Sequence, residues 1–323
     1  MMRVLVTGAD GFVGRTLCPF LAAKGYAVRA ALRRPPAGGA DGLPGVRETV
    51  TVGEIGPHTD WRAALPGMDA VVHLAARTHV MRETDPHPLD AFRTVNLLGT
   101  ERLAEAAAAQ GVRRLVLLST LHVHGERSGA RPFRESDPPH PAGPYAQSKW
   151  EAEQVLMRVA GETGLEGVVV RPPLLYGPEV KGNFLRLLRW VERGLPLPLA
   201  GVNNRRSLCG ATNLADLLEH CLRRPEAAGE TFLAADGEDL STPELIRRIA
   251  VLMSRPARLF YLPPAPLGLA ARLAGFGGQW SRLSGSLVVN AEKSRVLLGR
   301  QEPETVEEGL ARTVRWYGQA GPR

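Results

Sequence analysis

The first half of the chain alternates short apolar runs with longer segments whose apolar residues recur every three or four positions. The short runs predict six strands, at residues 4–7, 27–32, 50–52, 70–74, 115–119 and 167–171. The longer segments predict helices at residues 11–24, 88–110 and 145–163. Strands and helices that alternate at this spacing predict right-handed crossovers, and therefore an α/β fold with a doubly wound parallel sheet.

The pattern changes after residue 178. Pro196 and Pro198 interrupt the chain, the apolar runs shorten, and helices are predicted at residues 213–224, 242–253 and 304–317. We therefore expect residues 1–178 to form the sheet domain. Residues 179–323 should form mainly a smaller α/β lobe over the carboxyl edge of the sheet, with some later segments returning to the first domain.

Charge narrows the class of partner. The 323 residues carry 40 Lys and Arg against 33 Asp and Glu, which gives a net charge of +7. Arginines occur as scattered pairs, such as Arg33-Arg34 and Arg205-Arg206, without a polybasic block. This distribution favours a phosphorylated small molecule over a nucleic acid.

Cysteine usage and hydropathy indicate a cytoplasmic protein. Cys18, Cys209 and Cys221 fit neither a disulfide framework nor a zinc site, so we expect reduced core residues. The N-terminus shows no signal-peptide cleavage pattern, and no apolar stretch reaches the roughly 18 residues that a membrane span needs. The best candidate, residues 259–276, is interrupted by three prolines and Arg272. We expect a packed C-terminal helix there, with peripheral membrane contact as the alternative.

A glycine-rich turn follows the first strand. The segment TGADGFVG places Gly8, Gly11 and Gly14 between that strand and the first helix. Gly8 suits the backbone angles of the turn, Gly11 allows a pyrophosphate to approach the helix N-terminus, and Gly14 allows close packing of helix and strand. This context predicts a dinucleotide site in a Rossmann-type sheet, with the G-x-x-G-x-x-G spacing of short-chain dehydrogenases/reductases.

The end of the second strand bears on the choice of cofactor. A carboxylate there would bind the adenosine ribose and select NAD. The strand instead runs into Arg33-Arg34, and paired guanidinium groups can hold the 2′-phosphate of NADP. The sequence therefore favours NADP(H), while NAD stays possible.

Candidate catalytic residues lie at the start of the 145–163 helix. Tyr145 and Lys149 are four residues apart, so their side chains share one helix face. A tyrosine hydroxyl, with an ordinary pKa of about 10, needs a nearby ammonium to serve as a base at neutral pH. Thr120 follows the fifth strand at the carboxyl edge of the sheet, where its hydroxyl can bind the reacting oxygen. Together these residues predict proton transfer at a carbinol or ketone beside a nicotinamide.

With these motifs, the chain resembles the extended short-chain dehydrogenases/reductases, in the NAD-dependent epimerase/dehydratase family. It is similar to UDP-glucose/UDP-galactose 4-epimerases and to the UDP-4-keto-6-deoxy-N-acetylglucosamine 4-reductases of surface-polysaccharide synthesis. The likeness extends over nearly the whole chain, through VVHLAARTHVM (71–81), FRTVNLLGT (92–100), RRLVLLSTLHVHGE (113–126), PYAQSKWEAE (144–153), VVVRPPLLYGP (168–178), KGNFLRLL (181–188), NNRRSL (203–208) and GETFLAADGEDLSTPEL (229–245).

The resemblance implies roles for individual residues. It makes Thr120, Tyr145 and Lys149 the active site. Around the cofactor it places Gly8, Gly11, Phe12, Val13, Gly14, Arg33, Arg34, Leu74, Ala75, Ala76, Thr78, Asn96, Ser119, Tyr145, Lys149 and Pro172, with Glu54 and Ile55 at the adenine. Around the sugar nucleotide it places Thr120, His122, His124, Tyr145, Asn183 and Arg206. The resemblance also implies a homodimer whose seam involves residues 88–110 and 145–163.

Several positions depart from the family pattern. Leu174 stands where the family commonly has a substrate-contacting Asn, and His124 stands where it has Tyr. His124 is either a sugar-pocket residue or a space-filling replacement. Dehydratases carry an Asp-Glu pair directly after the catalytic Thr; here Leu121-His122 follows, which disfavours dehydration. The histidines show no metal-ligand spacing, so we expect no metal.

Three functions are compatible with these residues. The arginine pair favours an NADP(H)-dependent UDP-4-keto-sugar 4-reductase in polysaccharide or O-antigen precursor synthesis. The alternative is a UDP-sugar 4-epimerase of the UDP-glucose or UDP-N-acetylglucosamine type with tightly bound NAD. A non-catalytic dinucleotide-sensing protein is the third possibility, although Tyr145 and Lys149 are both present.

Overall fold

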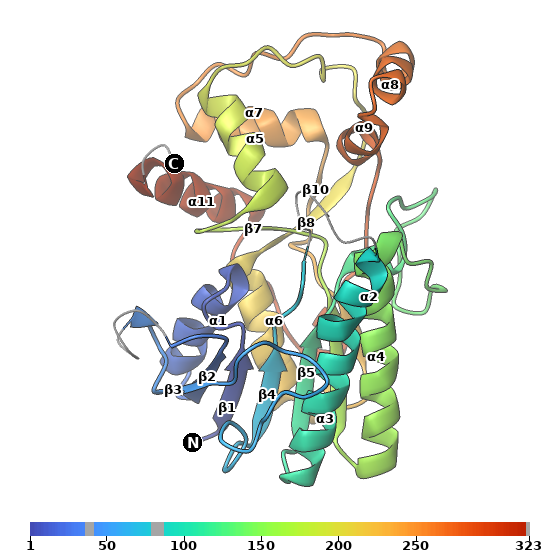
Figure 1. The fold of residues 1–323 in the computed structure, drawn as a ribbon. Helices are drawn as coiled ribbons and strands as arrows, with labels where there is room; N and C mark the ends of the chain where they lie inside the picture. Colours follow the sequence, from blue (N-terminus) through green and yellow to red (C-terminus); the bar gives the residue numbers. More distant parts are fainter. Residues whose placement is uncertain (36–41, 79–86, 321–323) are drawn as a thin grey trace.

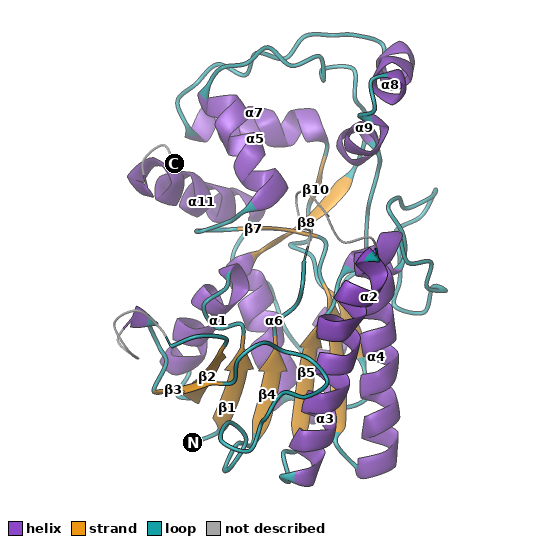
Figure 2. Ribbon diagram, viewed as in Figure 1, coloured by secondary structure: helices purple, strands orange, loops and turns teal. Residues whose placement is uncertain are grey.

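A seven-stranded parallel sheet with helices on both faces forms the lower part of the molecule (Figures 1 and 2). This computed structural model describes residues 1–35, 42–78 and 87–320. The strand order is β3-β2-β1-β4-β5-β6-β9. The strands are β1 Arg3–Thr7, β2 Ala27–Leu32, β3 Glu48–Thr51, β4 Ala70–His73, β5 Arg114–Leu118, β6 Glu166–Arg171 and β9 Thr231–Leu233.

Alternate side chains of each central strand face two separate hydrophobic cores, one on each side of the sheet. Val4 and Val6 of β1 face the core under α1 (Phe12–Ala23) and α6 (Ala211–Arg223), whereas Leu5 faces the other core. That second core lies under α3 (Gly99–Ala109) and α4 (Gly143–Thr163). A parallel sheet covered on both faces needs strands that are apolar at every position, and this explains the unbroken apolar runs in the sequence.

The upper part of the molecule is a smaller lobe over the carboxyl ends of the strands (Figure 1). It contains a three-stranded sheet in the order β10-β8-β7 and a core shared with three helices. Two further helices, α8 and α9, lie at its edge, and α10 returns to β9. The elements are β7 Leu174–Tyr176, β8 Arg206–Gly210, β10 Asp239–Leu240, α5 Gly182–Glu192, α7 Thr242–Leu252, α8 Pro264–Leu273, α9 Gly277–Ser284, α10 Glu292–Leu298 and α11 Val306–Ala320.

The predicted fold class is confirmed, and the predicted strands lie within about two residues of the observed ones. The expected helix at 88–110 is two helices, α2 (Pro88–Arg93) and α3, joined by a π-helical turn at Thr94–Leu98. The division at residue 178 stays a prediction. Residues 36–41, in the Pro/Gly-rich sequence after β2, lie outside the described part of the chain. Residues 79–81 of the VVHLAARTHVM motif (71–81) also lie outside it.

One expectation about packing is wrong. Residues 264–273 do form a helix, α8, but within Pro264–Leu273 no residue is buried. The apolar pattern indicated a helix correctly, yet among the described residues α9 covers only part of α8, and Leu269 and Leu273 stay exposed. By contrast, all three cysteines are buried and unpaired, as expected. None of the helices in residues 1–35, 42–78 and 87–320 is long and apolar enough to cross a membrane.

Gly14→Ala should destabilise the fold. A Cβ at Gly14 would lie 2.4 Å from the Gly8 carbonyl oxygen and 2.5 Å from the Ala9 Cα, and neither backbone atom can move away alone. We expect a loss of about 1–3 kcal/mol in the free energy of unfolding, measured by denaturant titration. The matched control is Gly161→Ala in α4, whose added Cβ meets nothing within 4 Å. Because alanine favours helix, this control should gain up to about 1 kcal/mol. Equal midpoints for the two variants would contradict the assigned packing.

Candidate active site

The glycine turn brings β1, α1 and the segment after β4 into close contact. Gly8 adopts a φ of 66°, in the left-handed region that glycine favours. A Cβ on Gly8 would lie 2.9 Å from the Ala75 amide nitrogen. The amide of Gly11 donates a hydrogen bond to the Gly8 carbonyl at 3.0 Å, which closes the turn. A side chain on Gly8 or Gly14 would therefore separate backbone segments that the fold holds together.

The N-terminus of α1 suits an anion. Gly11 precedes the helix and has no side chain to cap it, and the first turn carries no carboxylate. The first amide groups and the positive end of the helix dipole are therefore left for a ligand such as a pyrophosphate. Phe12 and Val13 lie in this same turn, so a bound diphosphate would contact their main chain. These residues fit a dinucleotide.

The end of β2 carries the predicted cofactor-selecting residues. Arg33 and Arg34 are exposed there, and the Arg33 guanidinium lies 3.5 Å from the Glu54 carboxylate. The neighbouring Ile55 packs against α3, where a Cβ on Gly99 would come within 2.5 Å of its Cγ2. Part of the positive charge at this strand end therefore already has a carboxylate partner.

Asn96 holds the segment after β4 in place. Its amide accepts a hydrogen bond from the Arg77 backbone nitrogen at 2.8 Å and donates to the Arg77 carbonyl at 3.0 Å. It also donates to the Ser148 hydroxyl on α4 at 2.9 Å. Asn96 is buried in the π-helical turn, a feature that is frequent at functional sites. The polar groups of Asn96 are engaged within the protein, so it positions the backbone of Leu74–Arg77. Thr78, which follows, is exposed.

Lys149 is buried between α4 and the end of β4. Its side chain is 1 % exposed, and burial lowers its pKa to about 8, against the opposing effect of Glu153. The positive charge of Lys149 also contributes to the low pKa of His73, about 3, which results mainly from burial of the imidazole. His73 Nδ1 lies 2.7 Å from the Thr7 hydroxyl, directly before the glycine turn. The Lys149 ammonium is therefore close enough to His73, the last residue of β4, to affect its pKa.

Tyr145 lies one helical turn before Lys149 on the same face of α4. Its ring contacts Phe92 of α2 edge-on, with centroids 6.0 Å apart. Burial raises the pKa of the Tyr145 phenol to about 12 in the absence of a cofactor. The phenol is therefore protonated at neutral pH until a nearby positive charge favours its phenolate.

Backbone hydrogen bonds bring Thr120 to the start of α4. The amide of His140 donates to the Val123 carbonyl at 2.8 Å, and that of Ala142 donates to the His122 carbonyl at 3.2 Å. Thr120 begins this short helical turn, and its hydroxyl accepts a hydrogen bond from the His122 amide at 3.3 Å. The segment that follows β5 is thus fixed against the residues that precede Tyr145. Pro172, directly after β6, supports this segment because its carbonyl accepts a hydrogen bond from the Leu121 amide at 2.9 Å.

A buried ion pair behind the site was not anticipated from the sequence. Glu153 lies one turn after Lys149 on α4, and Arg171 of β6 donates to both of its carboxylate oxygens, at 3.0 and 3.1 Å from Nε. The Ser119 hydroxyl donates to the same carboxylate. The four-residue spacing of Tyr145, Lys149 and Glu153 could have revealed the acid. The Arg171 partner is visible only in three dimensions.

The same network accounts for His124. Its Nε2 lies 2.8 Å from an Arg171 nitrogen, and its ring stacks on Phe133 with centroids 5.3 Å apart. Burial and the Arg171 charge lower the pKa of His124 to about 4, so the ring is neutral at pH 7. Here the imidazole fills space and accepts a hydrogen bond from Arg171. His122, its neighbour in the short turn, is half-buried.

The two predicted substrate residues of the lobe differ in their environments. Asn183 is exposed at the start of α5. Arg206 of β8 donates to the carbonyl oxygens of Arg282 and Gly285, at 2.7 and 3.0 Å, and burial lowers its pKa. Among the described residues, no carboxylate pairs with Arg206. Its charge is therefore available to an anionic ligand.

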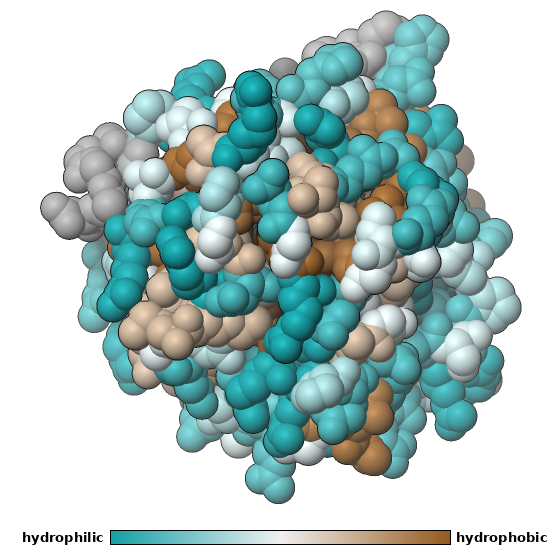
Figure 3. Space-filling view, turned by 90° about the horizontal axis from the view of Figure 1, so that it is seen from below, coloured by the Kyte–Doolittle hydropathy of each residue, from teal (hydrophilic) through white to brown (hydrophobic). Residues whose placement is uncertain are grey.

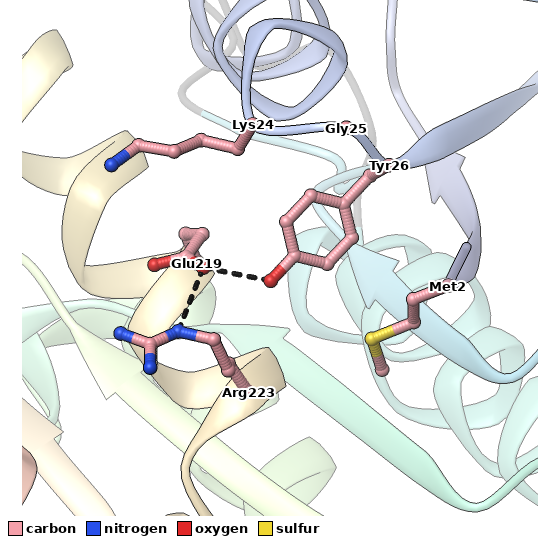
Figure 4. A pocket seen from close by; sticks show the side chains of 6 residues that line it. All are labelled: Met2, Lys24, Gly25, Tyr26, Glu219 and Arg223. Carbon is pink, nitrogen blue, oxygen red and sulfur yellow. Dashed lines mark hydrogen bonds and ion pairs between the residues drawn. The ribbon is translucent and has the colours of Figure 1, made fainter.

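A surface recess lies away from these residues (Figure 4). It measures about 350 Å³ and lies at the amino-terminal ends of β1 and β2, where Tyr26 and Arg223 both bond to Glu219. It therefore lies at the opposite end of the strands from the glycine turn. In the described ranges, no three His, Cys, Asp or Glu side chains gather as a metal site.

Arg171→Ala should be strongly destabilising, because it leaves the Glu153 carboxylate buried without its partner. We expect a loss of about 3–5 kcal/mol in the free energy of unfolding. The control is Arg158→Ala, which removes an exposed arginine paired with Glu101 and Glu162 and should leave the denaturant midpoint nearly unchanged. Two similar, small shifts would contradict the role assigned to the buried pair.

The pKa of Lys149 predicts a pH-dependent stability. Folding lowers it from 10.5 to about 8, so the unfolded chain binds more protons than the folded chain between these values. The cofactor-free protein should therefore gain stability relative to Lys149→Met as the pH rises through this window. Denaturant titrations of both proteins at about pH 7 and about pH 10 measure the effect. A constant difference between them would show that burial does not lower the pKa.

Comparisons with known proteins identify the family of this chain. Residues 4–235 match the NAD dependent epimerase/dehydratase family. The chain is 38% identical to a UDP-glucose 4-epimerase of Vibrio cholerae, over 99% of this chain and 97% of that protein. It is 29% identical to the 4-hydroxy-2-methyl-3-oxo-4-farnesyl-3,4-dihydroquinoline-1-oxide ketoreductase of Stigmatella aurantiaca, over 99% and 98% of the two chains.

A solved structure shows the same fold. The crystal structure of UDP-glucuronic acid 4-epimerase from Bacillus cereus in complex with NAD superposes with a TM-score of 0.80. The alignment covers 99% of this chain and 100% of that one, at 22% identity. The glycine turn and the alternating α/β pattern already resembled the extended short-chain dehydrogenases/reductases, and that resemblance is confirmed. The chain belongs to the NAD dependent epimerase/dehydratase family.

Proposed function

We propose that the protein is a nucleotide-sugar 4-epimerase that retains NAD. The observation that supports this proposal is the face of α4 that carries Tyr145 and Lys149. Ser148 of α4 is bonded to Asn96, which holds the segment after β4, and the residues before Tyr145 are bonded to the short turn that Thr120 begins. The similarity to the Vibrio cholerae UDP-glucose 4-epimerase extends over both whole chains and supports the same reaction type. A UDP-hexose of the UDP-glucose or UDP-N-acetylglucosamine type is the proposed substrate.

Each residue of this face has a defined task in the proposed reaction. Tyr145 takes the proton from the C4 hydroxyl of the sugar and later returns it, while Thr120 donates a hydrogen bond to the same oxygen. Lys149, with a pKa of about 8, stays mostly charged at pH 7 and favours the Tyr145 phenolate. Glu153 raises the pKa of Lys149 against the effect of burial, and so helps to keep that charge. A bound nicotinamide dinucleotide would supply the hydride acceptor and donor.

The lobe would hold the nucleotide. We assign Arg206 to the diphosphate, because its half-buried guanidinium is bound only to carbonyl oxygens among the described residues. Asn183 at the start of α5 would contact the same ligand. We propose His122 as a sugar contact and assign His124 a supporting role through Arg171.

A 4-ketoreductase that uses NADPH is the second candidate. Arg33 and Arg34 favour it, since exposed guanidinium groups at the end of β2 can bind a 2′-phosphate. The Arg33–Glu54 pair weakens this argument, because a 2′-phosphate would have to compete with a carboxylate 3.5 Å away.

We further propose a cytoplasmic homodimer with α2, α3 and α4 at its seam.

Cofactor retention separates the candidates. The epimerase should be purified with tightly bound, mostly oxidised NAD and should interconvert UDP-glucose and UDP-galactose, or their N-acetylated forms, without consuming added cofactor. A protein that binds no nucleotide on purification and oxidises NADPH only with a UDP-4-keto sugar would be the reductase. For the reductase, replacing both Arg33 and Arg34 by Ala should weaken NADPH binding. Dinucleotide binding without turnover of any sugar would identify a sensor and overturn both proposals.

Tyr145→Phe should abolish turnover and leave cofactor binding nearly intact. It removes one hydroxyl and keeps the ring against Phe92, so we expect a loss of about 100- to 10,000-fold in kcat. Tyr26→Phe, at the opposite end of the strands, is the matched control and should retain activity. Dinucleotide binding is followed by fluorescence and turnover by product analysis. Retained turnover in Tyr145→Phe would exclude Tyr145 as the acid–base group.

A further inference from the structure

The charges of the lobe are distributed unevenly along the chain. Residues 245–291 contain six arginines and neither a lysine nor an acidic residue. Residues 193–215, which reach the same end of the lobe, contain three arginines and again no acidic residue. Of these nine arginines, Arg205, Arg248 and Arg282 form ion pairs with acidic residues of other segments. The remaining arginines give this part of the lobe an excess of positive charge.

The same end exposes large apolar side chains. Leu269 and Leu273 lie one turn apart on α8 and are 60% and 82% exposed, and Phe276 directly after the helix is 59% exposed. The segment that leads into α8 adds the exposed residues Phe260, Tyr261 and Leu262. We call these six residues, with Arg255, Arg258 and Arg272, the distal surface. Its segments form the end of the lobe farthest from the N-terminus (Figure 1), whereas the opposite end, which Figure 3 shows, is mostly hydrophilic.

The fold holds the distal surface in place. Backbone hydrogen bonds join the 258–260 segment to the loop after α5, from Leu197 to the Arg258 carbonyl at 2.9 Å and from Phe260 to the Leu197 carbonyl at 3.1 Å. The indole of Trp280 on α9 approaches α8 so closely that a Cβ on Gly268 would lie 2.7 Å from its nitrogen. Packing and backbone bonds thus fix the apolar side chains in their exposed positions.

Within the part of the chain that the structure describes, the arginines of the distal surface lack partners of opposite charge. Arg255, Arg258 and Arg272 are exposed, and none of them forms an ion pair with a residue in the described ranges. Exposed arginines elsewhere do form such pairs, as Arg131 does with Asp137 and Arg62 with Asp60. Charge that the protein leaves unpaired beside exposed apolar residues suits an anionic partner with an apolar interior.

We propose that the distal surface binds the anionic face of a lipid bilayer. The apolar side chains would enter the boundary between headgroups and acyl chains, while the arginines contact lipid phosphates. A second copy of the chain fits this surface less well, because a two-fold contact would place arginines against arginines without an acidic residue between them. The active site lies on α4 and β1, so bound protein would keep its catalytic edge apart from the membrane contact. This inference does not depend on the proposed reaction.

Vesicle co-sedimentation of the full chain tests the proposal. The protein should bind vesicles of phosphatidylglycerol and phosphatidylcholine, bind pure phosphatidylcholine much less, and dissociate as salt is added. The combined change Arg255→Gln, Arg258→Gln and Arg272→Gln should weaken binding about 100-fold, at about fivefold for each arginine. The combined change Leu269→Ser, Leu273→Ser and Phe276→Ser should weaken it at least about tenfold.

Matched controls use residues of the same types elsewhere. Arg47→Gln with Arg315→Gln, and Val296→Ser with Leu297→Ser, change exposed residues before β3, on α11 and on α10, and should bind as the unchanged protein does. All variants should keep their unfolding midpoints and their turnover of soluble substrate, which separates this test from that of the reaction. Equal loss in controls and distal variants would overturn the proposal, as would absence of binding to anionic vesicles. Self-association that the apolar variant abolishes, without vesicle binding, would assign the surface to a second copy instead.

Discussion

The buried ammonium of Lys149 is the charge on which the arrangement of the site depends. Burial disfavours its charged form and lowers its pKa from 10.5 to about 8. The Glu153 carboxylate one turn away opposes this effect, and Arg171 in turn pairs with Glu153. Three buried groups of alternating charge, Lys149, Glu153 and Arg171, therefore lie in a row and keep Lys149 mostly protonated, so that it can act on Tyr145. Each charge offsets part of the desolvation cost of its neighbour.

Close backbone packing, rather than charge, holds the glycine turn against the end of β4. The close approach of Gly8 to Ala75 and of Gly14 to the turn fixes the edge of β1 beside the edge of β4. Asn96 then ties the continuation of β4 to Ser148 on α4, one residue from Lys149. The glycine turn and the Tyr145–Lys149 face thus belong to one hydrogen-bonded frame, and a shift of α4 would move both.

The lobe combines two different surfaces. Its inner side carries Arg206, whose guanidinium is held by carbonyl oxygens at the end of α9. Its outer side carries the exposed helix α8 and the unpaired arginines of the distal surface. Helix α9 lies between these two sides, because its Trp280 packs against α8 and its Arg282 carbonyl accepts a hydrogen bond from Arg206.

The sequence by itself determined the features that depend on near neighbours. The sheet strands, the glycine turn and the shared face of Tyr145 and Lys149 follow from spacings of two to seven residues. At such spacings the local backbone geometry fixes which way the side chains point. Tertiary structure alone decided that Arg171 neutralises Glu153, that His124 accepts a hydrogen bond from Arg171, and that Leu269 and Leu273 of α8 stay exposed. Apolar residues that recur every three or four positions show that a helix has an apolar face. Whether another element packs on that face depends on the path of the whole chain.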